Sequence, residues 1–448
     1  MLKGKQKSTK RKISRVTTWP ILWYVSCNWW KKEVLLPDCN RFHHLYMIWQ
    51  TWTWKSNMIL KQAISDIYRW CWICLFDTYW DLSETILQYY PKERIDDLIY
   101  FDLSNTEYPV WFNILEWGDT DEERELLVNN IVDMFVDMYW QEMFGPRIQD
   151  YFRNACLLLS EQHNHWNFLE IMGLFSDVAF AKTKIDNIKN PLVDYRWNTI
   201  YPKMWDREKQ EIIPFIQAKL SPFTTSKYIH SVIWQLRSSF NFEKVMQEKK
   251  VVICKFPKWI VWEKNTTIMC KLLLMQLQQA IVKRGSMPEK DRTPFFIYMD
   301  DFYQYVPNNF WEFLHNATKY NVGVTMTNQY IDQLKFSNSD ISKIILNNVG
   351  TILAFRVWNL DAEYLEKCFY PEFSTEDLKA LEKYVWIIKV SSNWIQWKPF
   401  LINTEVDFNN VTLNDKKKMD LIKKISSLHW WTKRSLVDKE LRYVLRWI

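Results

Sequence analysis

The sequence predicts an α/β fold in which a mostly parallel sheet carries one all-helical insertion. Short apolar runs alternate with helical patterns over residues 17–118, and the same alternation returns over residues 248–405. Between these two parts, strand patterns are missing. Lys55 and Ser56 close the loop between an apolar run and the helix that follows it, which is the setting of a phosphate-binding loop.

The first part of the predicted core follows a basic arm at residues 1–16. The arm carries seven Lys or Arg and no acid, so we expect it to be disordered, either as a solvated tail or in contact with nucleic acid or an anionic membrane surface. Asp77 ends a strand at the carboxyl edge, where parallel sheets bind ligands. Strands are expected at residues 33–36, 45–48, 73–77 and 98–101, and helices at residues 57–67 and 82–89.

The all-helical insertion is expected at residues 119–247, where apolar residues recur three and four apart. The second part of the core, residues 248–405, resumes the sheet, and residues 406–448 form a basic helical tail. Strands are expected in the second part at residues 250–256, 294–301, 322–327, 350–357 and 384–390, and helices at residues 266–284 and 309–320.

Size and charge narrow the class of protein. The chain has 448 residues, enough for two packed units, and its net charge of +6 favours a polyanionic partner. No apolar run reaches the roughly 18 residues needed to cross a bilayer, and the basic start is not followed by the apolar segment of a signal peptide. We therefore expect a cytoplasmic protein.

Cysteine and histidine give no metal or redox site. Cys71 and Cys74 form a CxxC pair inside an apolar strand pattern, where residues three apart point to opposite faces, so core packing is expected. The histidines, including His43-His44 and the pair at 163 and 165, lack a second ligand pair at zinc spacing.

The loop at residues 49–56 departs from the phosphate-loop pattern GxxxxGK[S/T]. Tryptophan stands at both glycine positions, 49 and 54, and at position 52, which is often glycine as well. Backbone N–H groups must curl around the phosphates there, so an indole at position 49 or 54 is expected to fill the phosphate site. The full set of predicted nucleotide-binding residues is Trp49, Gln50, Thr51, Trp52, Thr53, Trp54, Lys55 and Ser56.

Composition suggests a resolution of this conflict. The chain has seven Gly and 27 Trp, whereas an average chain of this length has about 7% Gly, or roughly 31. We hypothesise that many of these Trp are Gly in the native protein, as would happen if UGA codons for glycine were translated as tryptophan. Other Trp residues also stand where turns favour Gly: Trp29, Trp30, Trp80, Trp259, Trp262 and Trp394. The alternative is a genuinely Trp-rich protein whose loop binds no nucleotide.

A second polar set completes the prediction. The buried strand pattern FFIYM ends in Asp300 and Asp301, and Gln329 follows the next strand. A strand can simply end in a solvated acidic turn, but joined to the Lys55-Ser56 loop these residues form a specific set. In this interpretation, Lys55 contacts the β- and γ-phosphates of ATP and the Ser56 hydroxyl binds Mg²⁺. Asp300 holds the water shell of the metal, Asp301 polarises the attacking water and Gln329 senses the γ-phosphate.

Residues 33–402 resemble a known family on several of these motifs. The run MDDFYQYVPNNFWEFLHNATKYNVGVTMTNQYIDQL, together with ILNNVGTILAFRVWNLDAEYLEKCF and DTYWDL, is similar to the coupling proteins of type IV secretion, the TraG/TraD group. These belong to the HerA and FtsK class of RecA-like motor ATPases. Where that family has Gly, this sequence has Trp at positions 49, 52, 54, 80, 111, 259, 262 and 358.

The resemblance implies a hexameric ring that uses ATP and Mg²⁺ to move single-stranded DNA, with a relaxase and secretion-channel components as further partners. This sequence departs from the family at three places. Asp301 stands where the family usually has Glu, and Thr318 stands where many relatives carry an arginine finger, leaving Lys319 or Arg356 to replace it. The membrane-spanning N-terminus of many coupling proteins is missing, so we expect docking at the membrane through partners.

The sequence therefore predicts an ATP-driven DNA translocase of the coupling-protein type. One alternative is a HerA-like motor that acts on duplex DNA or packages it. The other is a scaffold with a dead nucleotide site, which holds if the Trp residues are real.

Overall fold

The computed structural model describes most of the chain. The described residues are 21–27, 30–50, 55–79, 81–113, 115–116, 120–162, 166–204, 206–235, 237–307, 309–336, 339–392, 395–404, 416–431, 435–436 and 439.

One twelve-stranded sheet organises the molecule. Its strands follow the order β2-β1-β14-β12-β11-β3-β8-β7-β4-β6-β5, and β13 pairs with β12. From β11 to β5 every neighbouring pair runs parallel, whereas the strands from β2 to β12 pair antiparallel. The strands are β1 Ile21–Cys27, β2 Trp30–Leu35, β3 Leu45–Ile48, β4 Trp72–Asp77, β5 Leu98–Asp102, β6 Val251–Lys255, β7 Phe295–Met299, β8 Val322–Asn328, β11 Thr351–Ala354, β12 Val385–Ser392, β13 Ile395–Gln396 and β14 Phe400–Asn403.

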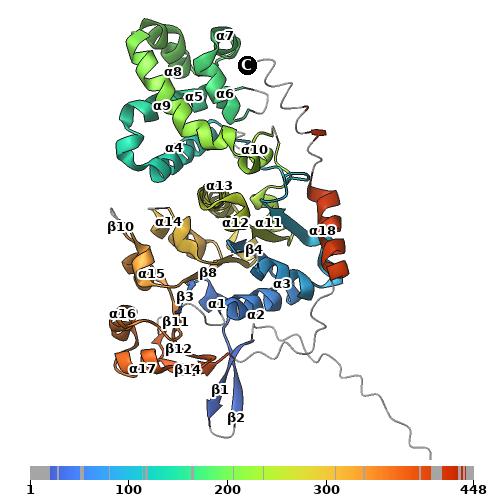
Figure 1. The fold of residues 1–448 in the computed structure, drawn as a ribbon, viewed down its shortest axis with the longest axis vertical. Helices are drawn as coiled ribbons and strands as arrows, with labels where there is room; N and C mark the ends of the chain where they lie inside the picture. The colour runs from blue at the N-terminus through green and yellow to red at the C-terminus, as the bar shows by residue number, and fades with distance from the viewer. Residues whose placement is uncertain are drawn as a thin grey trace, which may run out of the picture.

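The central strands are buried throughout and mostly apolar because helices cover both of their faces. Every residue of β3, β4, β7 and β8 is buried. Helices α2 (Lys55–Tyr68) and α3 (Asp81–Tyr89) pack on one face, and α13 (Glu263–Lys283) and α14 (Phe310–Lys319) pack on the other (Figure 1). The result is a three-layer α/β core.

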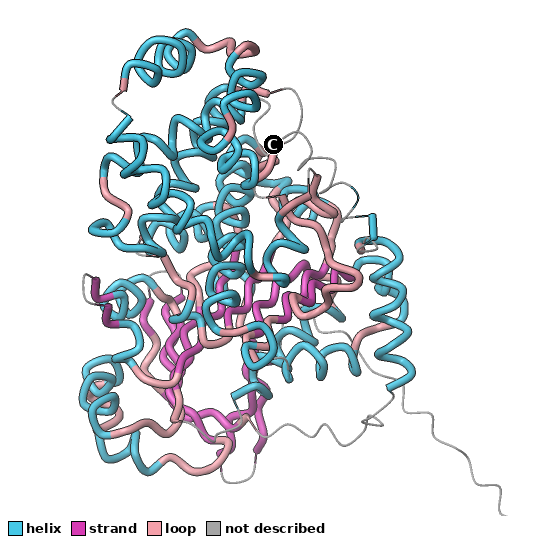
Figure 2. The backbone as a smooth tube through the Cα atoms, turned by 45° about the horizontal axis from the view of Figure 1, so that its top comes forward, coloured by secondary structure: helices cyan, strands magenta, loops and turns pink. Residues whose placement is uncertain are grey.

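A group of helices forms a separate unit beyond one end of the core (Figure 2). Its centre is aromatic: Phe135 on α4 packs against Phe152 and Phe223, with ring centroids 4.6 and 5.4 Å apart. It joins the core where α4 contacts α13. Its helices are α4 Asp121–Met143, α5 Pro146–Ser160, α6 Phe168–Ser176, α7 Val178–Ile185, α8 Pro191–Asp194, α9 Asp206–Thr225 and α10 Lys227–Ile233.

The remaining helices surround the sheet. Helix α18 (Lys416–Trp430) packs along the edge strand β5. The others are α1 Asp38–Arg41, α11 Phe242–Gln247, α12 Lys258–Val261, α15 Ile341–Asn348, α16 Asn359–Phe369 and α17 Thr375–Ala380, and a two-stranded ribbon pairs β9 (Lys335–Phe336) with β10 (Ser339–Asp340).

The predicted fold class is confirmed: a mostly parallel sheet carries an inserted helical unit. Helix α18 falls in the expected helical tail, and the expected basic arm lies outside the described residues. Cys74 is buried in β4 while Cys71 precedes that strand, and both are free thiols. Over the described ranges, no helix combines the length and the apolar character needed to cross a bilayer.

Candidate functional site

The predicted phosphate loop lies between β3 and α2. Strand β3 ends at Ile48 and α2 begins at Lys55, so the strand, loop and helix order expected from the sequence is present. Of Lys55 and Ser56 the structure describes the backbone, as the first two residues of α2. Thr51, Trp52, Thr53 and Trp54 lie outside the described residues. The N-terminus of this 14-residue helix faces the loop, where a helix dipole favours an anion.

The expectation that an indole at position 49 fills the phosphate site is wrong. Trp49 is 1% exposed and belongs to the core cluster that also contains Leu45 and Met47. Its ring lies 6.3 Å from that of Trp386 on β12, in an edge-on arrangement. The reason is the period of two along a strand, which places residues 45, 47 and 49 on one face of the sheet.

Asp300 and Asp301 follow β7 at the carboxyl edge of the sheet, as predicted. They are 1% and 0% exposed. Strand β7 lies between β4 and β8, and the Asp300 N–H donates to the Phe76 carbonyl in β4 at 3.1 Å. Asp301 has φ 45° and ψ 49°, a left-handed conformation that Asp tolerates better than most residues. This turn separates the directions of two consecutive carboxylates.

The Thr327 hydroxyl forms hydrogen bonds with both acidic residues. Thr327 Oγ1, on the neighbouring strand β8, donates to Asp300 Oδ1 at 2.8 Å and accepts from the Asp301 N–H at 3.2 Å. The side chain of Thr327 is fully buried.

Gln329 lies beside the acids, and its loop is held from two sides. Its Nε2 donates to Asp301 Oδ2 at 3.5 Å, a long contact. The N–H of Gln329 and that of Tyr330 both donate to Gln333 Oε1, at 3.0 and 3.1 Å. The Ile331 N–H donates to Asp361 Oδ1 on α16 at 3.0 Å, and burial raises the pKa of this Asp361 carboxyl. The loop after β8 is therefore fixed close to the acid pair.

Asp77 has a different function from the other acids at this edge. Its carboxylate accepts from the Tyr79 N–H at 3.0 Å and from the Ser83 N–H in the first turn of α3 at 2.7 Å. Asp77 therefore fixes the turn from β4 into α3.

The structure separates Lys319 and Arg356, the two candidates for the arginine finger that is missing at Thr318. Thr318 and Lys319 end α14, which leads into the amino end of β8, on the edge of the sheet opposite to Asp301. The Thr318 hydroxyl lies 2.9 Å from His44 Nε2. Arg356 instead follows β11 at the carboxyl edge, with an exposed side chain, and its carbonyl accepts from the N–H of Gln50 at 2.9 Å. Arg356 is thus next to the first residues of the phosphate loop.

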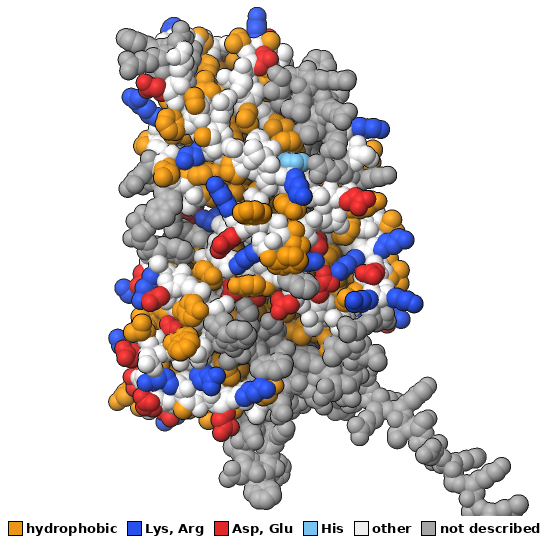
Figure 3. Space-filling view, viewed as in Figure 1, with side chains coloured by type: hydrophobic (Ala, Val, Ile, Leu, Met, Phe, Trp, Pro, Cys, Tyr) orange, Lys and Arg blue, Asp and Glu red, His pale blue; other side chains and the backbone are white. Residues whose placement is uncertain are grey.

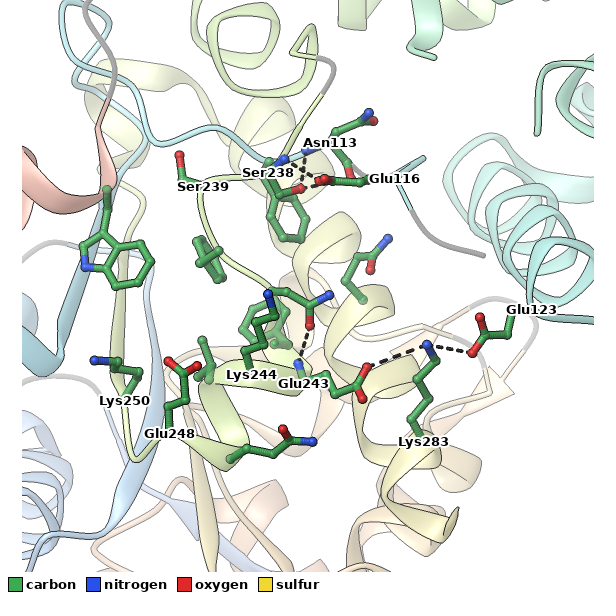
Figure 4. Close-up of a pocket in the computed structure, with 18 residues that line it drawn as sticks. Asn113, Glu116, Glu123, Ser238, Ser239, Glu243, Lys244, Glu248, Lys250 and Lys283 are labelled. Carbon is green, nitrogen blue, oxygen red and sulfur yellow. Dashed lines mark hydrogen bonds and ion pairs between the residues drawn. The ribbon is translucent and has the colours of Figure 1, made fainter. Parts of the chain in front are cut away.

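A separate cavity of about 690 Å³ lies between the helical unit and the core (Figure 4). Lys250 and Lys283 line it and stand at the amino ends of β6 and β7, so it is away from the acid pair. Across it, Lys283 pairs with Glu123 of α4 at 2.7 Å and with Glu243 of α11 at 3.6 Å. The pair between Lys283 and Glu123 joins the helical unit to the core.

The residues at the carboxyl edge fit a nucleotide with a divalent cation. Two buried carboxylates supply the oxygen ligands that Mg²⁺ prefers, and the N-terminus of α2 points at the same edge. The parallel pairing of β3 with β8 and of β8 with β7 brings Ile48, Asn328 and Met299 to this edge together.

Sequence reasoning missed three residues of the site: Thr327, Gln333 and Asp361. A signal for Thr327 existed, because it stands two residues before Gln329 on a buried strand and so faces the same side. Gln333 stands four residues after Gln329, at the spacing of one turn. Nothing local points to Asp361, which reaches the loop from a separate helix.

The fold is shared with solved structures of other proteins. The chain is similar to the plasmid coupling protein TrwB in complex with a non-hydrolysable ATP analogue, with a TM-score of 0.59 and 11% identity over 84% of this chain and 88% of that one. It is also similar to VirB4 of Thermoanaerobacter pseudethanolicus, with a TM-score of 0.57 and 10% identity over 87% and 97%. No family model and no curated protein matches the sequence. The chain therefore has the fold of TrwB and VirB4.

Proposed function

We propose that this protein is an ATP-driven DNA translocase resembling conjugative coupling proteins, which hydrolyses ATP to move single-stranded DNA toward a secretion channel. The observation that supports it best is the buried pair Asp300 and Asp301. The pair is tied to the strand of Gln329 and lies at the sheet edge where the Lys55-Ser56 loop ends.

Each residue has a defined task in this proposal. Lys55 neutralises the β- and γ-phosphates, and the Ser56 hydroxyl and Asp300 hold the metal with its water shell. Asp301 orients and polarises the attacking water, and Gln329 reports the presence of the γ-phosphate to the loop after β8. Bound Mg²⁺ supplies charge stabilisation on the transferring phosphoryl group. TrwB has been solved with an ATP analogue and with ADP and Mg²⁺, which supports this pair of ligands.

We assign to Arg356 the role of the missing arginine finger, which is to supply a positive charge. The hydrogen bond from the Gln50 N–H to the Arg356 carbonyl places the Arg356 backbone at the carboxyl edge of the sheet, whereas Lys319 lies at the opposite edge. An Arg at this position stabilises charge that develops on the phosphates.

The hypothesis that many Trp are native Gly receives support from backbone geometry. Trp262 has φ 71° and ψ 143°, close to a region populated almost only by Gly, and its side chain is 75% exposed. Trp70 has φ 61° and is 53% exposed. Trp259 and Trp358, at family Gly positions, are also exposed. The buried Trp49 does not follow this pattern, so the codons at positions 49, 52 and 54 are the ones to read.

The decisive experiment measures ATP hydrolysis by the native protein, after its intact mass has fixed the number of glycines. Hydrolysis that Lys55→Ala abolishes, and that Asp301→Asn lowers by at least about 100-fold, supports the proposal. Asn retains the left-handed backbone of Asp301, so folding is preserved in that variant. If the folded native protein neither binds nor hydrolyses ATP, the scaffold alternative holds. Recovery of activity in a chain with Gly at positions 49, 52 and 54 would assign the loss to the indoles.

The preferred DNA substrate distinguishes a coupling protein from a HerA-like motor. A coupling protein prefers single strands, whereas a HerA-like motor or packaging ATPase prefers duplex ends. Competition between single-stranded and duplex DNA of the same length, read as stimulation of ATP hydrolysis, distinguishes the two functions.

We further propose that the working form is a hexameric ring in the cytoplasm, attached to the inner face of the membrane through partners. A relaxase and secretion-channel components are the proposed partners. Mass photometry with and without nucleotide and DNA tests the hexamer, and failure to assemble under every condition would contradict it.

A further inference from the structure

We propose that Thr327 is a positioning residue that sets Asp300 for metal binding and fixes the turn at Asp301. This inference rests on the proposed ATPase function and adds a residue to its machinery. Thr327 touches neither nucleotide nor metal in this proposal and acts only through the two acids.

The single proton of the hydroxyl determines the arrangement. Thr327 Oγ1 lies 2.8 Å from Asp300 Oδ1 and 3.4 Å from the Met299 carbonyl, so the proton goes to the carboxylate. Hydrogen bonds to a charged acceptor are the stronger kind. Oδ1 is thereby engaged within the protein, and the carboxylate rotation of Asp300 is fixed before any cation arrives.

Thr327 Oγ1 also accepts a hydrogen bond, from the Asp301 N–H, and this bond fixes the backbone at Asp301. Its N–H points to Thr327 Oγ1, not along the sheet, because φ of 45° turns the chain out of the strand. Without the hydroxyl, a fully buried N–H would lose this partner, which is costly. Thr327 therefore stabilises the turn that aims Asp301 at Gln329 while Asp300 keeps its own direction.

The two residues after Thr327 connect the acid pair to the strand that precedes the nucleotide loop. Asn328, the next residue, accepts from the Tyr46 hydroxyl of β3 at 2.6 Å, and Gln329 follows it. Three consecutive side chains thus connect the acid pair, the strand before the phosphate loop and the sensor position. A change at Thr327 is expected to alter metal use more than nucleotide affinity.

The test compares Thr327→Val, which removes the hydroxyl at nearly constant volume, with Thr327→Ser, which keeps it. Thr325→Val is the matched control, because Thr325 lies two residues earlier on the same face of β8 and is also buried, at 5% exposure. Thermal unfolding shows which variants are folded. If Thr327→Val does not fold, Thr327→Ala is used in its place.

Two readouts follow. The first is the Mg²⁺ concentration that gives half-maximal ATP hydrolysis, which we expect Thr327→Val to raise at least about five-fold. In the same variant, we expect kcat to fall about 10- to 100-fold and KM for ATP to change less than about two-fold. The second needs no turnover: the affinity for a fluorescent ADP is measured in Mg²⁺ and in EDTA. We expect Thr327→Val to lose the Mg²⁺-dependent gain and to keep the affinity in EDTA.

Thr327→Ser and Thr325→Val should behave as the wild type in both readouts. Wild-type Mg²⁺ dependence in a folded Thr327→Val protein overturns the inference, as does loss of Mg²⁺ dependence in Thr327→Ser or an equal effect of Thr325→Val. If the wild type hydrolyses ATP and Thr327→Val matches it, only this inference fails. If the folded wild type neither binds nor hydrolyses ATP, the proposed function fails and this inference fails with it.

Discussion

His44 shows how a single buried side chain ties the first core strand to the elements around it. The Val324 N–H donates to His44 Nδ1 at 3.2 Å, so the ring proton is on Nε2, which donates to the Leu314 carbonyl at 2.8 Å. Burial lowers the pKa of His44 to about 4. The ring is therefore neutral in the folded protein at pH 7, and it joins α14 and β8 to the chain before β3.

This geometry predicts an acid-sensitive stability. The pKa of His44 is lower in the folded than in the unfolded chain, so its full contribution is present above about pH 6.5 and is lost as the pH falls toward 4. The loss is on the order of 3 kcal/mol. The free energy of unfolding, measured by urea between pH 7 and pH 4, should fall more steeply for the wild type than for His44→Asn. Asn suits the positive φ of 63° at this position.

The neighbouring His43 provides a graded comparison for this measurement. Its charge also lowers the pKa of His44, although burial is the larger cause, so His43→Asn should reduce the pH dependence by less than His44→Asn does. Equal slopes for the wild type and His44→Asn would contradict the assignment of the acid sensitivity to His44.

At the scale of elements, α18 closes the open edge of the sheet. Among the described strands, β5 pairs only with β6, so one row of its backbone groups has no strand partner within that part of the chain. Ser426 Oγ accepts from the Tyr100 N–H at 3.1 Å and donates to the Leu98 carbonyl at 2.9 Å. Trp431 Nε1 donates to the Tyr100 carbonyl at 3.1 Å. Side chains of α18 and of the residue that follows it thus replace the missing strand.

Ser426→Ala is therefore expected to destabilise the protein by about 1–3 kcal/mol, since two buried backbone groups lose their partner. Ser427→Ala is the matched control, because the Ser427 hydroxyl bonds only within its own helix, to the Lys424 carbonyl. Urea unfolding at pH 7 measures both. A loss below about 0.5 kcal/mol for Ser426→Ala would mean that water or the rest of α18 satisfies the edge.

Sequence patterns located the central elements because strands covered on both faces are mostly apolar. The expected strand at residues 45–48 coincides with β3. The expected strand at 250–256 is one residue longer than β6 at each end, and the one at 322–327 is one residue shorter than β8. Strand β14 was not predicted. It is short and half-exposed, so its pattern does not stand out. Strand β1 was not predicted either.

The candidate site was predictable in part for a related reason. Asp300, Asp301 and Gln329 end buried strands, and a polar residue after an apolar run stands out in the sequence. The hydrogen bonds that set their geometry join residues far apart: Thr327 lies 27 residues from Asp300, and Asp361 lies 30 from Ile331. Strand order and register create these contacts, and no local pattern encodes either of them.

At the scale of the whole molecule, the distribution of surface charge suits sequence-independent binding to a polyanion. Figure 3 shows acidic and basic side chains mixed over much of the visible face, with basic ones frequent along the side where α18 lies. On that helix, Lys418 and Lys423 are engaged with the core through Gln88 and Glu84. Lys416, Lys417 and Lys424 are exposed.

The double variant Lys417→Gln with Lys424→Gln is expected to weaken DNA binding and to reduce the slope of log K against log salt by about 1.4 for single strands. The loss should be the same for different sequences, because phosphates carry no sequence information. Fluorescence anisotropy from 50 to 300 mM salt measures it. Lys343→Gln on α15, also an exposed lysine, is the control, and an unchanged slope in the double variant would exclude α18 from the DNA contact.

The bond between Tyr100 and Ser426 spans 326 residues, and this separation affects how the chain is made. At about 5–20 residues per second, a ribosome needs roughly 15 to 65 s to synthesise that interval. Throughout this time the nascent β5 has no α18 to cover it, and its first strand partner, β6, also lies beyond the whole helical unit. An early-emerging apolar strand with an open edge is a natural client for a chaperone, so yield in a foreign host should depend on holding this segment apart from other chains until translation ends.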